Sequence, residues 1–280
     1  MITRRQFIQS SFGALAAAAN ARAITPRSQP LGVQLYTVRS LTQRDLPRVL
    51  AGIRRIGYEE VETYWDVYSH PATELKRMIE DHGLRVPSGH FDYDGLEGKL
   101  DYAATLGVQF IVCPMLPPQL RTLDGFKRAA DQFNKWGAQI ERMGMQLGFH
   151  THNYEFARYG GTTGFDILVK ETDPNLMCFE IDCYWVTEAG RDPVKMIETL
   201  GRRVRLLHMK DRKRGFPLSQ TLNAQAEHFT PVGTGTIDWK AVIAAAKRDG
   251  IRHYFVEQDS GPPAPMECLR ISYRNLRPLI

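Results

Sequence analysis

The sequence predicts a single-domain α/β protein, a (β/α)₈ barrel of the TIM-barrel class. Short apolar runs that suit β-strands alternate with longer segments of helical periodicity through almost the whole chain. Such alternation is typical of a parallel sheet with right-handed crossovers. The chain has 280 residues, and about 250 residues are typical of one such barrel.

Eight apolar runs are short enough to be strands, and each is followed by a segment with a different period. The fifth run is expected to extend past its apolar part through Glu155. The predicted strands cover residues 31–36, 58–62, 84–90, 108–113, 146–155, 177–182, 204–208 and 253–257.

Helical patterns lie between these runs, with apolar residues three and four positions apart. Several of them end in a glycine that leads into the next strand, as expected for a helix C-terminus. The predicted helices cover residues 46–56, 72–82, 96–106, 123–143, 164–172, 192–200 and 238–249.

Polar residues recur near the strand ends at a regular interval. The series Gln34, Glu62, His90, Glu155, Asp182, His208 and Glu257 has gaps of 28, 28, 65, 27, 26 and 49 residues. The gap of 65 contains the fourth strand, and the gap of 49 contains an insertion. A period near 27 fits one βα unit, and eight units favour a closed barrel. An open, doubly wound sheet is the alternative architecture, but no G-x-G-x-x-G fingerprint follows the first strand.

The first residues have the features of an export signal. Arg4 and Arg5 precede a short, mildly apolar stretch at 7–19, and Ala21-Arg22-Ala23 matches a small-residue cleavage pattern. Two adjacent arginines before a weak apolar stretch are typical of twin-arginine export. We therefore predict a signal peptide at 1–23, a linker at 24–30, a barrel at 31–280, and a periplasmic or secreted protein. An amphipathic N-terminal helix is the alternative.

Charge and cysteine content exclude several classes of protein. Removal of residues 1–23 takes away three arginines and no acid, so the formal charge falls from +5 to +2, which gives no reason to expect nucleic-acid binding. No later stretch is apolar enough for a membrane span, so no membrane anchor is expected after cleavage. The cysteines show no C-x-x-C spacing, and buried free thiols are expected at Cys113, Cys178, Cys183 and Cys268.

Four polar residues of the later strands are candidates for a metal site. In a barrel the C-terminal strand ends converge on one mouth, so Glu155, Asp182, His208 and Glu257 would face one another. Unpaired carboxylates that close would raise each other's pKa strongly. A divalent cation resolves the conflict, and these ligands favour Mn²⁺ or Mg²⁺, with Co²⁺ and Zn²⁺ as alternatives. A buried salt-bridge network is the structural alternative.

Six ordered motifs resemble those of the xylose-isomerase-like sugar (phosphate) isomerase/epimerase family. They are F-H-T-H-N-Y-E-F at 149–156, F-E-I-D-C-Y-W-V at 179–186, A-G-R-D-P at 189–193, L-L-H-M-K-D at 206–211, V-G-T-G-T-I-D-W at 232–239 and V-E-Q-D at 256–259. The resemblance spans about residues 31–275. It implies that Glu155, Asp182, His208 and Glu257 hold one divalent metal, and that the two glutamates act as an acid/base pair.

The chemistry of such a site is proton transfer beside a carbonyl. The metal polarises the carbonyl and stabilises the enediolate, while one carboxylate removes the proton and another group returns it. Glu155 and Glu257 are the candidate catalytic residues, and Lys210 is placed to stabilise the oxyanion or, alternatively, to pair with Asp211. The candidate substrate-binding residues are His90, His152, Lys210, Trp185 and Tyr36. Either of the two histidines is an alternative acid/base group, whereas packing is the alternative for the two aromatic residues.

Departures from the family pattern leave the reaction open. Trp185 stands three residues after Asp182, where ketose epimerases of the family often carry a histidine, so the substrate contacts are expected to differ. The extra ligands of the related endonucleases are mostly missing. The leading prediction is a metal-dependent sugar isomerase or epimerase acting on a small sugar or keto-sugar, compatible with a homo-oligomer. The alternatives are a lyase or deglycosidase acting on 3-keto-glycosides and a non-catalytic sugar-binding barrel.

One glycine-rich segment has two interpretations. Val232 to Thr236 resembles a phosphate cradle, but a turn that leads to a helix capped by Asp238 is the better prediction.

Overall fold

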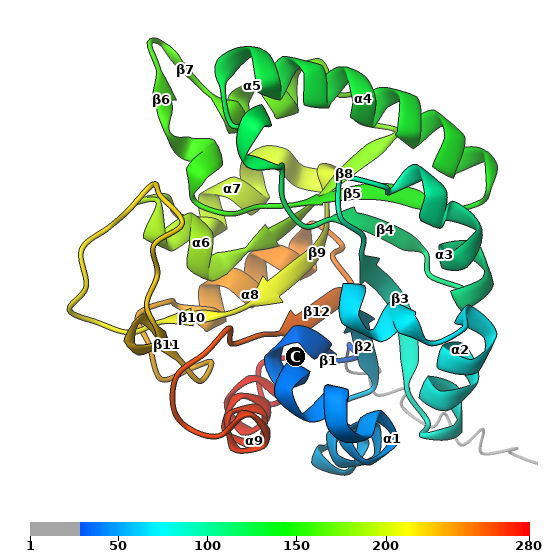
Figure 1. Ribbon diagram of the computed structural model, residues 1–280. Helices are drawn as coiled ribbons and strands as arrows, with labels where there is room; N and C mark the ends of the chain where they lie inside the picture. Colours follow the sequence, from blue (N-terminus) through cyan, green and yellow to red (C-terminus); the bar gives the residue numbers. More distant parts are fainter. Residues whose placement is uncertain (1–28) are drawn as a thin grey trace, which may run out of the picture.

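A closed barrel of eight parallel strands lies at the centre of the molecule (Figure 1). The computed structural model describes residues 29–280, so the predicted signal peptide and residues 24–28 of the linker lie outside the described residues. The strands pair in the order β1-β12-β9-β8-β5-β4-β3-β2. Their bounds are β1 Gly32–Gln34, β2 Glu60–Thr63, β3 Arg85–His90, β4 Phe110–Cys113, β5 Gln146–His150, β8 Met177–Asp182, β9 Val204–Met209 and β12 His253–Val256. The predicted fold class is confirmed.

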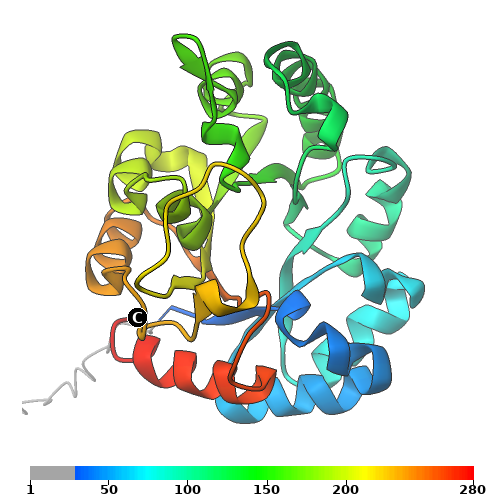
Figure 2. The ribbon, with the colours of Figure 1, turned by 60° about the vertical axis from the view of Figure 1, so that its left-hand side comes forward.

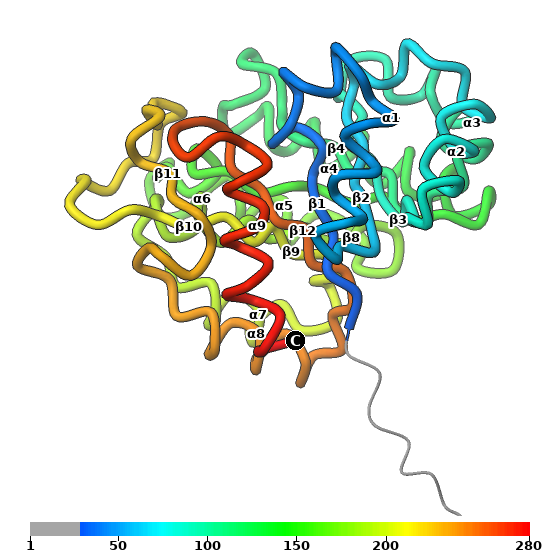
Figure 3. Tube along the Cα trace, turned by 90° about the horizontal axis from the view of Figure 1, so that it is seen from below, coloured from blue at the N-terminus to red at the C-terminus, as the bar shows by residue number. Residues whose placement is uncertain are grey.

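Helices surround the barrel, and α9 lies beside α1 where the ring of helices closes (Figure 3). The Tyr58 hydroxyl donates to the Leu269 carbonyl at 2.9 Å, which ties the last helix to the start of the second strand. The helices are α1 Arg39–Ile56, α2 Ala72–Asp81, α3 Leu100–Leu106, α4 Leu123–Arg142, α5 Gly164–Glu171, α6 Cys183–Glu188, α7 Pro193–Leu200, α8 Trp239–Arg248 and α9 Pro265–Leu276. In the part of the chain that is described, no helix is long and apolar enough to cross a membrane.

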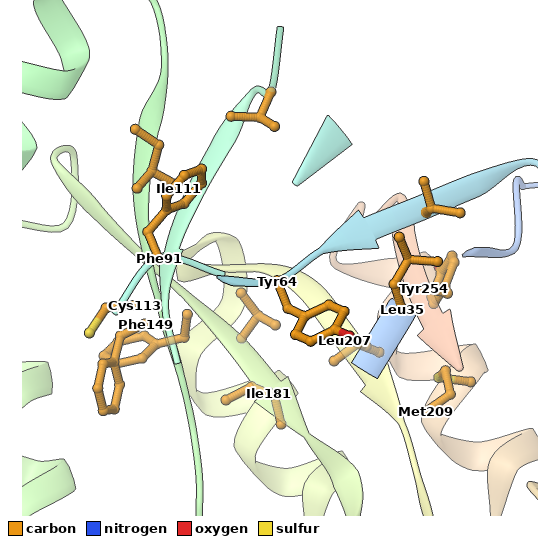
Figure 4. Close-up of a cluster of buried hydrophobic side chains, with 14 of the residues drawn as sticks. Leu35, Tyr64, Phe91, Ile111, Cys113, Phe149, Ile181, Leu207, Met209 and Tyr254 are labelled. Carbon is orange, nitrogen blue, oxygen red and sulfur yellow. The ribbon is translucent and has the colours of Figure 1, made fainter. Parts of the chain in front are cut away.

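The main core lies between the strands and the helices, because every second strand residue points outward. Ile111, Phe149, Ile181 and Leu207 belong to this cluster (Figure 4). The residues next to them in sequence point into the barrel. There, a smaller apolar cluster of Phe110, Val112, Cys178, Leu206 and Phe255 fills the interior. Apolar side chains therefore pack on both faces of the sheet. The polar side chains that point into the barrel lie near the C-terminal ends of the strands.

The predicted strand through Glu155 is wrong in its second half. β5 ends at His150, and the backbone N–H of Thr151 makes a last hydrogen bond to the Glu180 carbonyl at 3.0 Å. The chain then turns into the 3₁₀ helix Tyr154–Phe156. The Glu155 carboxylate accepts from the backbone N–H of His152 at 3.1 and 3.2 Å, a local bond that competes with an extended strand.

Two helices were absent from the predicted elements. α6 begins directly after β8, and the Asp182 side chain caps it by accepting from the Trp185 backbone N–H at 3.0 Å. α9 follows the last strand and has a Pro in its first turn. All four cysteines are buried and free, which confirms the expectation of free thiols.

The V-G-T-G-T segment wraps around the buried carboxylate of Asp211. This carboxylate accepts from the backbone N–H of Gly233 at 2.9 Å, of Gly235 at 3.0 Å and of Ile237 at 3.3 Å, and from the Trp239 indole at 2.9 Å. A Cβ on Gly235 would lie 2.2 Å from a carboxylate oxygen, so only glycine fits there. These N–H groups are already satisfied, and the turn interpretation is therefore the correct one.

The inserted residues 213–228 stand out from the barrel between the short strands β10 (Asp211–Arg212) and β11 (Phe229–Thr230) (Figures 1 and 2). Arg212 anchors this insertion, because its guanidinium pairs with the buried Glu188 and donates to the Phe216 carbonyl at 2.6 Å. Asp211 and Arg212 thus fix the chain on both sides of the insertion. A second short ribbon pairs β6 (Arg158–Tyr159) with β7 (Thr162–Thr163).

We predict that Asp211→Asn destabilises the protein by about 3 kcal/mol, because the amide NH₂ cannot accept the hydrogen bonds that the carboxylate accepts. Urea unfolding measures the effect. Asp238→Asn is the matched control: Asp238 caps α8 by accepting from the Ala241 N–H at 3.0 Å, and Asn caps helices equally well. Equal unfolding midpoints for the two variants would contradict the assigned role of Asp211.

Candidate active site

The C-terminal end of the barrel carries a buried polar layer. Asp182, His208 and Glu257 come from β8, β9 and the end of β12, and their ligating atoms lie within 4.8 Å of one another. His208 Nδ1 lies 3.0 Å from Glu257 Oε2 and 3.8 Å from Asp182 Oδ2. Three of the four predicted ligands are therefore brought together.

His150, at the end of β5, completes this set from the neighbouring strand. Its Nε2 lies 3.7 Å from Asp182 Oδ2. That Asp182 oxygen is buried and makes no hydrogen bond, but it lies 3.1 Å from the Lys210 ammonium. Lys210 therefore offsets part of the cost of burying this charge, and a divalent cation bound by the neighbouring imidazoles would offset more of it. We call His150, Asp182, His208 and Glu257 the upper set.

Glu155 belongs to neither group of neighbouring metal-ligating side chains found among the described residues. Its carboxylate lies against the His152 backbone N–H. Burial raises the pKa of Glu155 to about 8, so the carboxyl group is mostly protonated at neutral pH. Its predicted roles as ligand and base stay predictions, while the structure places His150 at the strand end where Glu155 was expected.

A second group of polar side chains adjoins the upper set, and its Glu180 lies one pleat deeper than Asp182 on β8. Glu180 Oε2 lies 2.9 Å from His150 Nδ1 and 2.8 Å from His90 Nε2. Glu62 Oε2 lies 2.6 Å from His208 Nε2 and 3.2 Å from His90 Nε2. Each imidazole of the upper set is thus held by a carboxylate at the nitrogen that faces away from Asp182 and Glu257. We call Glu62, His90 and Glu180 the lower set.

The carboxylates determine the charge of the histidines between them. Burial acts to lower the pKa of His90, but Glu62 and Glu180 outweigh it and raise the pKa to about 9. Burial opposes charge on His208 as well, yet Glu180, Glu257 and Glu62 raise its pKa well above the usual value. His208 therefore carries a proton that it must release before Nδ1 can bind a metal.

Lys210 neutralises the carboxylates at the edge of the upper set. Its ammonium lies 2.6 Å from Glu257, 2.8 Å from Asp259 and 3.1 Å from Asp182. Burial opposes this charge, but the three carboxylates raise the pKa of Lys210 well above its usual value. Pairing of Lys210 with Asp211 is therefore not observed, since Asp211 accepts from the glycine-rich turn.

A pocket of about 360 Å³ opens above these groups, a volume within the range of about 300–1,000 Å³ typical of small-molecule sites. All five predicted substrate-binding residues line it, and so do His150, Glu257 and Asp259. Burial lowers the pKa of His152 well below the usual value, and its Nδ1 has no hydrogen-bond partner. His152 is therefore a neutral imidazole, able to accept a proton.

Comparison with known proteins agrees with this arrangement, since the model of the xylose isomerase-like TIM barrel family matches residues 50–267. The chain belongs to this family. The family resemblance predicted from the six motifs is thereby confirmed.

Relatives and solved structures with named activities are enzymes. Inosose dehydratase of Clostridium perfringens is 28% identical over 235 residues, which cover 71% of this chain and 78% of the relative. A sugar phosphate isomerase/epimerase from Parabacteroides distasonis is 25% identical, with a TM-score of 0.75 over 93% of this chain and 99% of that one. An L-ribulose 3-epimerase shares the fold at 16% identity, with a TM-score of 0.69 over 90% and 94% of the two chains.

His150, Glu180 and Asp259 were missed in the sequence. His150 was overlooked because the strand was extended to Glu155. Glu180 has a signal: it stands two residues before Asp182, and residues two apart on a strand share a face. Glu180 was therefore available from strand periodicity, and Glu62 and His90 already stood in the series of polar residues near strand ends.

We predict that Glu155→Gln flattens the pH dependence of stability. A carboxyl group whose pKa is raised by folding contributes stability that is complete below its unfolded pKa of about 4.5 and is lost as the pH rises through about 8. Between pH 5 and pH 8 the wild type should lose about 3 kcal/mol more than the variant. Denaturant unfolding of both proteins in the presence of a chelator measures their free energies of unfolding. If these free energies changed in parallel with pH in the wild type and the variant, the prediction would be wrong.

Proposed function

We propose that the protein is a divalent-metal-dependent enzyme that removes a proton beside the carbonyl of a small keto-sugar or cyclic polyol ketone. The observation that carries the proposal is the upper set, whose four ligand-type side chains come from four neighbouring strands. The ligating atoms of Asp182, His208 and Glu257 lie within 4.8 Å of one another, and His150 Nε2 lies 3.7 Å from Asp182 Oδ2. Family membership and the activities of the relatives support it.

The donor set fits a divalent cation. His150, Asp182, His208 and Glu257 would hold it, with two imidazoles and two carboxylates. This mixture suits Mn²⁺, Co²⁺ or Zn²⁺ better than Mg²⁺, which prefers oxygen ligands. When bound, the metal supplies a Lewis acid that polarises the substrate carbonyl.

His152 is the best candidate for the base. It lines the pocket, its Nδ1 has no hydrogen-bond partner, and burial lowers its pKa so that the imidazole is neutral. Lys210 is charged and lines the same pocket, so it serves as a hydrogen-bond donor to the oxygen on which negative charge develops. Glu257 binds Lys210 and faces the metal position, which leaves it less free to take up a proton.

Elimination is the outcome that the site favours. An epimerase needs two proton-transfer groups on opposite sides of the substrate; of the predicted pair only Glu257 lines the pocket, and His208 and Lys210 already hold its carboxylate. In elimination, His152 takes the proton on carbon, the C–H electrons form a C=C bond, and the bond from the next carbon to its oxygen substituent breaks. The leaving oxygen takes up a proton as it departs, and the imidazolium that His152 has just become supplies it, so that the step consumes no net proton. The dehydratase activity of the curated relatives is of this type. Isomerisation or epimerisation is the second candidate, supported by the similar isomerase/epimerase.

We also propose that the protein acts outside the cytoplasm. The support is the pair Arg4-Arg5, the apolar stretch and the small-residue cleavage pattern at the start of the sequence. Fusion of residues 1–30 to a reporter that is exported only by the twin-arginine route tests this, with an Arg4→Lys, Arg5→Lys pair as the control.

We predict about one divalent metal per chain, and at least a 100-fold loss of metal affinity in His150→Gln, since one of four ligands is weakened. Elemental analysis and competition with a chelator measure these quantities. Glu155→Gln is the matched control and should stay within about threefold of wild type. The opposite result, with Glu155→Gln losing the metal and His150→Gln keeping it, would restore Glu155 as the ligand.

We predict that His152→Gln lowers turnover by about 10²–10⁴-fold while metal content is unchanged, because the proton acceptor is lost but no ligand is removed. Loss of water from inosose and exchange of substrate protons with deuterated solvent are the two readouts. Exchange without elimination by the wild type would favour the isomerase. Absence of both from the metal-loaded protein, across keto-sugars and cyclic polyol ketones, would leave a sugar-binding barrel.

A further inference from the structure

The mouth of the pocket exposes large apolar side chains, in contrast to its charged floor. Trp65 is 40% exposed and Leu222 is 37% exposed, and both line this pocket. Among the described residues only two other large apolar side chains, Met143 and Leu218, are exposed, and Leu218 belongs to the same insertion as Leu222. Apolar side chains gathered around one opening indicate a ligand contact more strongly than scattered ones do.

Aromatic packing holds one wall of the mouth in place. Trp65 lies in the 3₁₀ helix Trp65–Ser69 after β2, with its ring centroid 5.4 Å from that of Tyr64 and 5.5 Å from that of Tyr36. The Arg39 guanidinium lies 4.0 Å from the Tyr36 ring centroid and donates to the Tyr36 carbonyl at 2.9 Å. The rings are therefore preorganised, so a flat ligand can stack without ordering them first.

The insertion 213–228 supplies further apolar lining from elsewhere in the chain. Leu222 and Ala224 line the pocket from this segment. Asn153 fixes it, because the side-chain amide donates to the Ser219 carbonyl at 3.0 Å and to the Thr221 carbonyl at 2.7 Å. The mouth is thus lined by aromatic rings and by aliphatic side chains from two separate loops.

Charge also distinguishes the floor from the mouth. At the floor, three carboxylates already bind Lys210. Arg39 is the one other Lys or Arg among the residues that line the pocket, and it lies over Tyr36. The floor therefore suits an uncharged polyol ring, whereas the mouth suits a group with an apolar face.

We propose that the natural substrate is a keto-glycoside whose aglycone is an aryl group, with the sugar ring on the charged floor and the aryl group stacked on Trp65 at the mouth. This rests on the proposed function, since elimination beside a carbonyl of the sugar would release the aglycone as the leaving group. It specifies the substrate class of the same site.

The test measures binding without turnover, so that it does not depend on catalysis. Isothermal titration of the metal-loaded, mature chain compares phenyl β-glucoside with methyl β-glucoside, in wild type and Trp65→Ala. We expect the phenyl compound to bind about tenfold more tightly to wild type, and the preference to fall below about twofold in the variant. Trp65→Phe should restore part of the preference. Met143→Ala, which removes an equally exposed side chain outside the pocket, should leave the preference intact.

Three results would overturn the proposal. The first is a phenyl preference that is unchanged in Trp65→Ala, and the second is no measurable binding of either glucoside. The third is that glucose 6-phosphate binds more tightly than phenyl glucoside and that Arg39→Gln abolishes this binding. The last result would assign a phosphorylated sugar instead. These results differ from those expected if the proposed function were wrong. In that case the protein would show neither proton exchange nor elimination, while the phenyl preference and its dependence on Trp65 would remain.

Discussion

The active end of this barrel depends on mutual neutralisation of charges that are almost completely removed from water. Glu62, Glu180, Asp182 and Glu257 are all 5% exposed or less. A buried carboxylate without a partner costs several kcal/mol. Two protonated histidines and Lys210 neutralise most of this charge, and they leave an excess of carboxylates that a divalent cation would offset. The positions of these side chains are therefore linked, and His208 must release a proton before Nδ1 can bind a cation.

The alternation of side chains along each strand determines where these charged groups lie in the site. Glu180 and Asp182 lie two residues apart on β8 and point into the barrel at successive depths, as do Leu206 and His208 on β9. The lower carboxylates each bind one nitrogen of an upper imidazole, and the other nitrogen is left to face Asp182. Such contacts fix the tautomer and orientation of histidine ligands and raise their basicity. The lower set is thus a positioning layer, and its burial is what makes the upper set precise.

Much of the fold was predictable because it rests on local pattern. Alternating strand and helix periods located all eight barrel strands, and six of the residues taken to mark strand ends lie within or directly after their strands. The exception was Glu155. The motif F-H-T-H-N-Y-E-F contains two histidines and one glutamate, and continued alternation was assumed through it. The chain turns at Thr151 because the Glu155 side chain binds the His152 backbone N–H, a local bond that strand periodicity does not reveal.

Contacts between distant loops set the limit of sequence reasoning. Trp65 and Leu222 are separated by most of the barrel in sequence, and no pattern in either segment indicates that both line one opening. The position of Lys210 next to Asp211 made an ion pair the alternative to an oxyanion-stabilising role, whereas the structure pairs Lys210 with residues from β8 and from the end of β12. These contacts form when the barrel closes. Strand and helix periodicity predicts that it closes, but it does not predict which side chains then come into contact.

The turn after β5 connects the two halves of the site. Within four residues it carries the ligand candidate His150, the base candidate His152, and Asn153, whose amide holds the insertion at Ser219 and Thr221. The shape of the mouth and the position of the base are therefore mechanically coupled through one short segment. Loss of the Asn153 amide would therefore free the insertion at Ser219 and Thr221 and disturb the backbone next to His152. The complete burial of this amide fits a structural role at the junction between the two.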